Sequence, residues 1–161
     1  MPNTTEKEFV KDYPRPPQIA FSTEKIKVVA LGEVIIQTNY SVRILETYHP
    51  PTYYFPPDCV LMQYLKKDNG RPSFCEWKGI ASYFNIEVGD KVINKAVWTY
   101  QKPSAYFEKI AGWYAVYPHL MDGCWVDNEK VDSQKGGFYG GWITSRIQGP
   151  FKGDPEHPEL I

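Results

Sequence analysis

The chain has 161 residues, a formal net charge of −1 and 42% hydrophobic residues. This length fits one globular domain with a sizeable core, and the balanced charge gives no basic excess for binding nucleic-acid phosphates. No apolar run approaches the roughly 18 residues of a membrane helix, and the first residues lack the apolar core of a signal peptide. We therefore expect a cytoplasmic protein that has no membrane span and does not bind nucleic acid.

Aromatic residues make up 16% of the chain, which also contains 14 prolines and 12 glycines. Aromatic residues favour strands, whereas proline and glycine favour turns. The composition therefore predicts a mainly β fold. Residues 1–18 hold four prolines and show little apolar periodicity, so we expect an N-terminal arm there.

Short strands and turns follow the arm. The patterns predict, in chain order, a hairpin over 25–31 and 33–37, strands over 42–47, 52–55 and 60–66, a loop at 75–79, a hairpin over 80–88 and 91–100, one short helix over 104–111 and a strand over 112–117. Together these elements define a β domain over 19–122.

The last third of the chain is rich in glycine and aromatic residues. It predicts a hairpin over 124–126 and 130–131, followed by the glycine-aromatic segment 136–142. Its rings are too many to leave in water, because large exposed apolar patches are uncommon on monomers. We expect the extension 123–161 to pack on the domain or on a partner. In the second case, residues 124–153 would contact another protein or a second copy of the chain.

Glu46 and His49 form the first candidate site. In a strand over 42–47, Val42, Ile44 and Glu46 share one face, which places Glu46 at the end of an inward-facing row. A carboxylate and an imidazole within reach of each other are typical of general acid and base catalysis. The structural alternative is that Glu46 accepts backbone N–H groups and His49 orients the Pro50-Pro51 turn.

The segment Cys75-Glu76-Trp77-Lys78-Gly79 forms the second candidate site. An ammonium near a cysteine favours the thiolate, so Cys75 beside Lys78 is a candidate nucleophile, although free cysteines are often small buried hydrophobes. Lys78 is also a candidate anion-binding group, and Gly79 would let a backbone N–H approach the same anion. Cys59, Cys75 and Cys124 lack the paired spacing of a zinc site, so we expect no metal and no cofactor.

Aromatic residues near these motifs are candidates for the walls of a cleft. Trp98 and Tyr100 share one face of a predicted strand. Tyr54, Trp77 and Tyr83 would join them around a pocket, unless all five simply belong to the core.

Several of these motifs, taken in order, resemble the signature of the DUF427 family: Leu45–Pro56, Cys75–Gly79, Ala81–Tyr83, Trp98–Tyr100 with Pro103, and Ile110–Gly112. The resemblance runs from about residue 28 to 117. The tail 136–153 looks like the extension of cyanobacterial and plastid members. The resemblance implies a small two-sheet, β-tent-like domain. β-tent relatives commonly hold zinc with two C-x-x-C pairs, which this chain lacks, so no metal is implied.

The residues leave three functions open. The first is binding of an unidentified small polar or anionic molecule by Glu46, His49, Tyr54, Cys75, Trp77, Lys78, Gly79, Tyr83, Trp98 and Tyr100. The second is an enzyme that uses Glu46 and His49 as acid and base, or Cys75 as nucleophile. The third is a protein-interaction module that uses the C-terminal aromatic segment.

Overall fold

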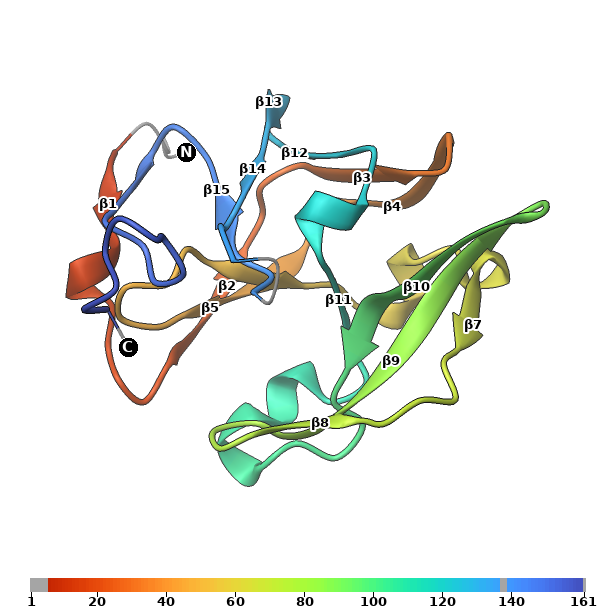
Figure 1. Ribbon diagram of the computed structural model, residues 1–161, viewed down its shortest axis with the longest axis horizontal. Helices are drawn as coiled ribbons and strands as arrows, with labels where there is room; N and C mark the ends of the chain where they lie inside the picture. The colour runs from red at the N-terminus through yellow and green to blue at the C-terminus, as the bar shows by residue number, and fades with distance from the viewer. Residues whose placement is uncertain (1–5, 137–138, 161) are drawn as a thin grey trace.

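The computed structural model describes residues 6–136 and 139–160. These residues form sixteen strands, arranged in five sheets, and five short 3-10 helical segments. The predicted mainly β class is confirmed. Figure 1 shows the small sheets packed around a common centre, with no long helix among the described elements.

The largest sheet has the strand order β11-β10-β9-β7, and β8 pairs with the other end of β9. Its strands are β7 (Leu65–Lys67), β8 (Ser73–Cys75), β9 (Gly79–Val88), β10 (Lys91–Thr99) and β11 (Tyr114–Val116). The hairpin predicted over 80–88 and 91–100 is confirmed by the β9–β10 pairing. It is the long green ribbon at the right of Figure 1.

A second sheet has the order β2-β5-β6, with β2 at Gln18–Ser22, β5 at Ser41–Leu45 and β6 at Thr52–Tyr54. All five residues of the central strand β5 are buried. A bridge between Phe55 and Tyr114 joins this sheet to the largest one. Buried side chains of both sheets, such as Ile44 and Trp98, also belong to one hydrophobic cluster, so the two sheets share part of the core.

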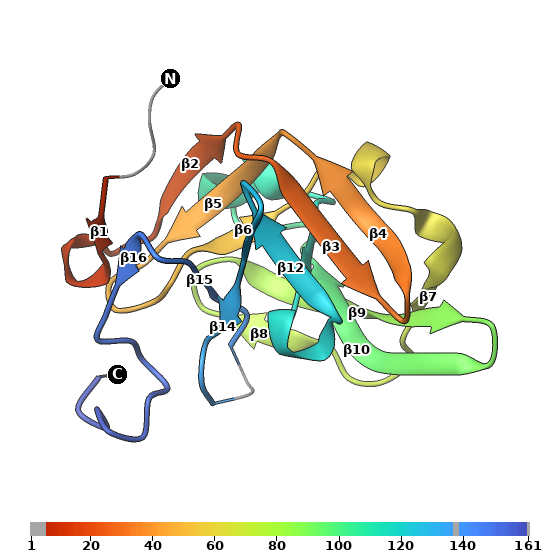
Figure 2. The same ribbon diagram turned by 90° about the horizontal axis from the view of Figure 1, so that it is seen from above.

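The third sheet has the order β13-β12-β3-β4, so it pairs a strand from the first third of the chain with one from the last third (Figure 2). Its strands are β3 (Ile26–Ala30), β4 (Glu33–Thr38), β12 (Gly123–Val126) and β13 (Glu129–Lys130). The hairpins predicted at 25–37 and 124–131 are both confirmed. Because β12 pairs with β3, the residues after 122 are part of the main body of the fold.

Three predicted elements differ in the structure. Residues 60–66 do not form one strand, because Pro57 starts a 3-10 segment at Pro57–Cys59, a second one follows at Met62–Tyr64, and β7 begins only at Leu65. The predicted helix at 104–111 is a 3-10 segment, Ala105–Ile110, which is kinked at Phe107. The strand expected to include Glu46 ends at Leu45.

The C-terminal segment packs on the same molecule. β14 (Asp132–Ser133) pairs with β15 (Trp142–Ile143), and β16 (Ile147–Gln148) pairs in parallel with β1 (Glu8–Phe9) of the arm. Trp142 is fully buried, with its ring centroid 4.8 Å from that of Tyr53. The arm and the tail thus hold each other against the core.

The remaining 3-10 segments are Val10–Asp12 and Pro118–Leu120. Within the described residues, none of the helical segments is long and apolar enough to cross a membrane.

Candidate functional site

A cleft of about 350 Å³ opens between the second sheet, the largest sheet and the C-terminal segment. Nine of the ten residues predicted to form a binding site line it: Glu46, His49, Tyr54, Cys75, Trp77, Lys78, Tyr83, Trp98 and Tyr100. Gly79, the tenth, lies outside the lining, at the base of the hairpin turn that carries Lys78. The two sequence motifs, about thirty residues apart, therefore meet at one site.

The Cys75–Gly79 segment is the tight end of the β8–β9 hairpin. Cys75 pairs with Gly79, which leaves Glu76, Trp77 and Lys78 in the turn. Gly79 has φ +110°, a conformation that glycine adopts with little strain. Ser104 holds the turn in place by donating its hydroxyl to the Trp77 carbonyl at 2.6 Å and its N–H to the Lys78 carbonyl at 3.0 Å. The segment expected to be a loop is thus a hairpin turn, and hydrogen bonds from Ser104 hold it in place.

The floor of the cleft is aromatic. The Trp98 indole N–H donates to the Tyr54 hydroxyl at 3.0 Å, and the Trp98 and Tyr117 ring centroids are 4.5 Å apart. Trp98 and Tyr100 stand on either side of Thr99 at the end of β10, and both line the cleft. Burial raises the pKa of the Tyr54 and Tyr100 hydroxyls above their usual value, so both phenols are neutral at physiological pH.

Positive charge surrounds His49. Burial, and then the nearby positive charges of Lys152, Arg15 and Lys78, together lower the pKa of this imidazole to about 4. The ring packs edge-on against Tyr139, with centroids 5.5 Å apart. His49 is therefore a neutral imidazole at pH 7, placed among three cationic side chains.

Glu46 and His49 lie in the turn that follows β5. The His49 N–H donates to the Glu46 carbonyl at 2.9 Å. The Glu46 carboxylate pairs with Arg15, with Nε and Oε2 3.6 Å apart. The carboxylate is thus engaged by a cation from the N-terminal arm, and the two residues are joined through their backbone.

The Lys78 ammonium donates to the Cys75 sulfur, with Nζ and Sγ 3.6 Å apart. It also lies 6.0 Å from the centroid of Tyr100 and 5.6 Å from that of Phe107. Among the described residues, no carboxylate stands at ion-pair distance from Lys78 or Lys152. Both cations remain available to an anion that enters the cleft.

Sequence reasoning missed the wall that the C-terminal segment contributes. Gln134, Tyr139, Gly140 and Lys152 line the cleft. Gln134 is 2% exposed and donates to the Lys152 carbonyl at 2.6 Å. A Cβ on Gly140 would overlap the Trp98 ring, so only glycine fits at this position. The glycine-aromatic composition of the segment was therefore the one sequence feature that pointed to this close packing. Gly137 and Phe138 of that segment lie outside the described residues.

Metal-ligating groups do not gather at the cleft. In the part of the chain that the structure describes, no group of three or more His, Cys, Asp or Glu side chains is placed to hold a metal ion. Cys59, Cys75 and Cys124 are free thiols.

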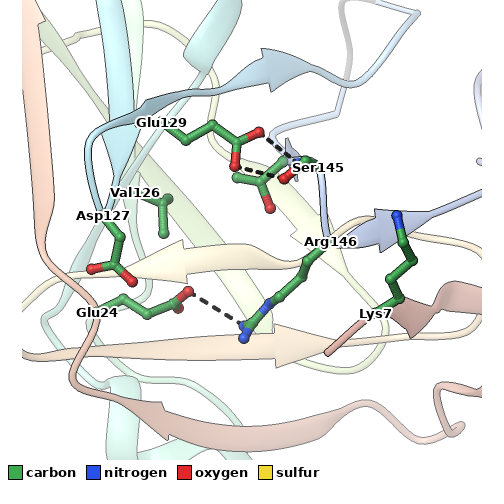
Figure 3. A pocket seen from close by; sticks show the side chains of 8 residues that line it. Lys7, Glu24, Val126, Asp127, Glu129, Ser145 and Arg146 are labelled. Carbon is green, nitrogen blue, oxygen red and sulfur yellow. Dashed lines mark hydrogen bonds and ion pairs between the residues drawn. The ribbon is translucent and has the colours of Figure 1, made fainter. Parts of the chain in front are cut away.

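A second cavity of about 260 Å³ lies where the N-terminal arm, the β12–β13 hairpin and the tail meet (Figure 3). Arg146 pairs with Glu24 at 3.3 Å, and Ser145 donates its N–H and its hydroxyl to Glu129 at 2.6 and 2.9 Å. Arg146 also pairs with Glu8 of the arm at 3.3 Å. These contacts around the cavity fasten the tail to the N-terminal arm and to the body of the fold.

The fold and the cleft define a small, mainly β protein with an aromatic cleft whose lining includes two lysines and two glutamates. Comparison with protein families matches residues 18–127 to a domain of unknown function (DUF427), and the chain belongs to that family. Comparison with curated proteins finds no match. The matched region ends before Gln134, so the C-terminal wall of the cleft lies outside it.

Proposed function

We propose that the protein binds a small anion in the cleft between the second sheet and the β8–β9 hairpin. The observation that carries this proposal is the set of cations around the neutral His49. Lys78 and Lys152 line the cleft, and Arg15 is close enough to act on the same imidazole.

The carboxylates of the cleft do not cancel this charge. Glu46 already pairs with Arg15, and Glu76 lies on the exposed hairpin turn, where solvent screens it. Lys78 and Lys152 instead contact ring faces, which compensate an ammonium less well than a carboxylate does. An incoming anion would therefore gain the pairing that both lysines lack.

The first test is a titration with inorganic phosphate, followed through the indole N–H signals of Trp77 and Trp98 in an NMR spectrum. Lys78→Met and Lys152→Met should each weaken binding about 10- to 150-fold, since a charge-assisted hydrogen bond contributes roughly 1.5–3 kcal/mol. Lys109→Met is the matched control, because the Lys109 ammonium also lies over a ring, that of Phe21, but outside the cleft.

Equal affinity in all three variants would contradict the proposal. Native mass spectrometry of freshly purified protein gives a second readout, because a co-purifying anion should be lost from the Lys78→Met variant.

The second candidate function is an enzyme with Cys75 as nucleophile. The specific observation is the Lys78 ammonium 3.6 Å from the Cys75 sulfur, at the edge of an open cleft. The use of Glu46 and His49 as acid and base has less support, because a pKa of about 4 makes His49 a weak base near pH 7. A reaction abolished by Cys75→Ala, with phosphate binding preserved, would select this candidate.

The third candidate, a protein-interaction module, has the least support. Trp142 of the C-terminal segment is buried in the chain's own core, and Phe151 packs against a cluster that includes Tyr13 and Ile147. A mass consistent with a dimer under native conditions would revive the interaction proposal.

The proposed location of the protein is a reducing cytoplasm, in which three free thiols persist.

A further inference from the structure

We infer that the ligand is an aryl anion, meaning a planar aromatic ring that carries a negatively charged group. This inference rests on the proposed function, because it specifies the molecule to which the anionic group belongs. It is drawn from the chemistry of the cleft walls.

Rings dominate the apolar part of the lining. Phe74, Trp77, Tyr83, Trp98, Tyr100 and Tyr117 all contribute. Of the described residues that line the cleft, Ile44 is the single branched aliphatic one. A pocket for an alkyl chain needs only apolar area, whereas ring walls add the edge-to-face and offset-stacked contacts that favour another ring. The lining therefore selects for an aromatic ligand.

The rings of the cleft also differ in exposure from the floor to the rim. Trp98 and Tyr100 are 7% and 6% exposed and form the floor. Trp77 and Tyr83 are half-buried, and Phe74 is 74% exposed at the rim. A ligand that covers an exposed ring is stabilised, because burial of apolar surface contributes roughly 25 cal/mol of binding free energy for each Å² removed from water.

The cations stand beside the ring walls. The Lys78 ammonium lies 6.0 Å from the centroid of Tyr100, and the Lys152 ammonium lies 5.6 Å from that of Tyr139. A ligand ring packed against these walls would bring an attached anionic group within reach of an ammonium. The cleft volume of about 350 Å³ lies in the range of small-molecule sites, which is about 300–1,000 Å³.

Four probes test this inference on the full chain: benzoate, cyclohexanecarboxylate, benzyl alcohol and inorganic phosphate. Dissociation constants are measured from the indole N–H signals of Trp77 and Trp98, and those of Trp113 and Trp125, which lie outside the cleft, serve as internal controls. Benzoate should bind about 2- to 10-fold more tightly than cyclohexanecarboxylate, which has the same charge but no π face. It should bind at least about tenfold more tightly than benzyl alcohol, which has the ring without the charge.

The outcomes separate this inference from the proposed function. If cyclohexanecarboxylate and benzoate bind equally well, the anion site stands and the aryl preference is wrong. If benzyl alcohol binds as well as benzoate, the anionic requirement is wrong and the proposed function falls with it. If no anion shifts the cleft signals, the proposed function fails and this inference fails as a consequence.

A pair of variants assigns the preference to a wall of the cleft. Trp77→Leu keeps apolar area in the hairpin turn but removes its π face, so the ratio between benzoate and cyclohexanecarboxylate should fall toward one. Trp125→Leu should leave that ratio unchanged, because Trp125 lies between Lys27 and Lys130 on the third sheet. An unchanged ratio in the Trp77→Leu variant would overturn the assignment of the aryl contact to this turn.

Discussion

His49 makes the stability of the protein depend on pH in a window where most carboxylates do not titrate. Its pKa falls from 6.5 in the unfolded chain to about 4 in the folded one, chiefly because the ring is buried and then because Lys152, Arg15 and Lys78 surround it. His49 therefore binds a proton below about pH 6.5 in the unfolded chain, but only below about pH 4 in the folded chain. The free energy of unfolding should fall as the pH falls through this window. The full effect is about 3 kcal/mol, of which about 2 kcal/mol is lost between about pH 7.5 and pH 5.

Urea unfolding of the wild type and of His49→Gln at several pH values above about pH 5 measures this effect. The lower limit avoids the titration of Glu8, whose pKa is held below its usual value of 4.5, so that its stabilising contribution is lost only at lower pH. Between about pH 7.5 and pH 5, the free energy of unfolding should fall by about 2 kcal/mol less in the variant than in the wild type, whatever the stability of the variant at pH 7.5. His119→Gln is the comparison variant: burial also lowers the pKa of His119, but this residue is exposed, so its replacement should reduce the pH dependence less than His49→Gln does. The same pH dependence in wild type and His49→Gln would refute the assignment of a buried, neutral imidazole.

Two further predictions concern the ion-pair network and the thiols. Glu8→Gln should cost about 3 kcal/mol in urea unfolding, because it leaves the guanidinium of Arg43, 7% exposed and 2.8 Å from Glu8, without its paired charge. The double variant with Arg43→Met should recover part of that loss, and an additive loss would contradict the reasoning. Iodoacetamide at neutral pH should alkylate Cys75 first, because burial raises the pKa of Cys59 to about 11 and that of Cys124 to about 12. Peptide mass mapping identifies the modified residue, and faster labelling of Cys59 would refute this order.

Local patterns in the sequence predicted the paired strands and most of the cleft. The β9–β10 hairpin follows from two predicted strands that flank the Gly89-Asp90 turn, and alternation alone placed Trp98 and Tyr100 on one face. The strand over 42–47 was predicted to end two residues too late, because β5 ends at Leu45. The chain bends after Leu45, Tyr48 adopts φ +67°, and Glu46 leaves the strand to meet Arg15. A contact with a residue thirty-one positions earlier leaves no trace in a local pattern.

Packing of the extension 123–161 on the domain was one of two expectations from the sequence, but the residues that it adds to the cleft could not be predicted, for a related reason. Lys152 and Gln134 belong to short, irregular segments whose positions depend on pairings such as β1 with β16 and β14 with β15. Strands of two residues carry too little periodicity to be recognised from sequence. The one local sign was glycine next to aromatic residues, which here reflects the close approach of Gly140 to Trp98.

This division of the cleft bears on how its ligand preference arises. The region matched by the DUF427 family, residues 18–127, supplies Lys78 and the rings of the cleft other than Tyr139. The segments outside it supply Arg15 and Lys152, two of the three cations that act on His49. The arm and the tail are in turn fastened to each other by the β1–β16 pairing and by the ion pair of Glu8 with Arg146. Any change that loosens this ion-pair network should therefore weaken anion binding while leaving the ring contacts in place. Under the Glu8→Gln substitution, benzoate should lose more affinity than benzyl alcohol, and equal losses would show that the arm and tail do not contribute charge to the site.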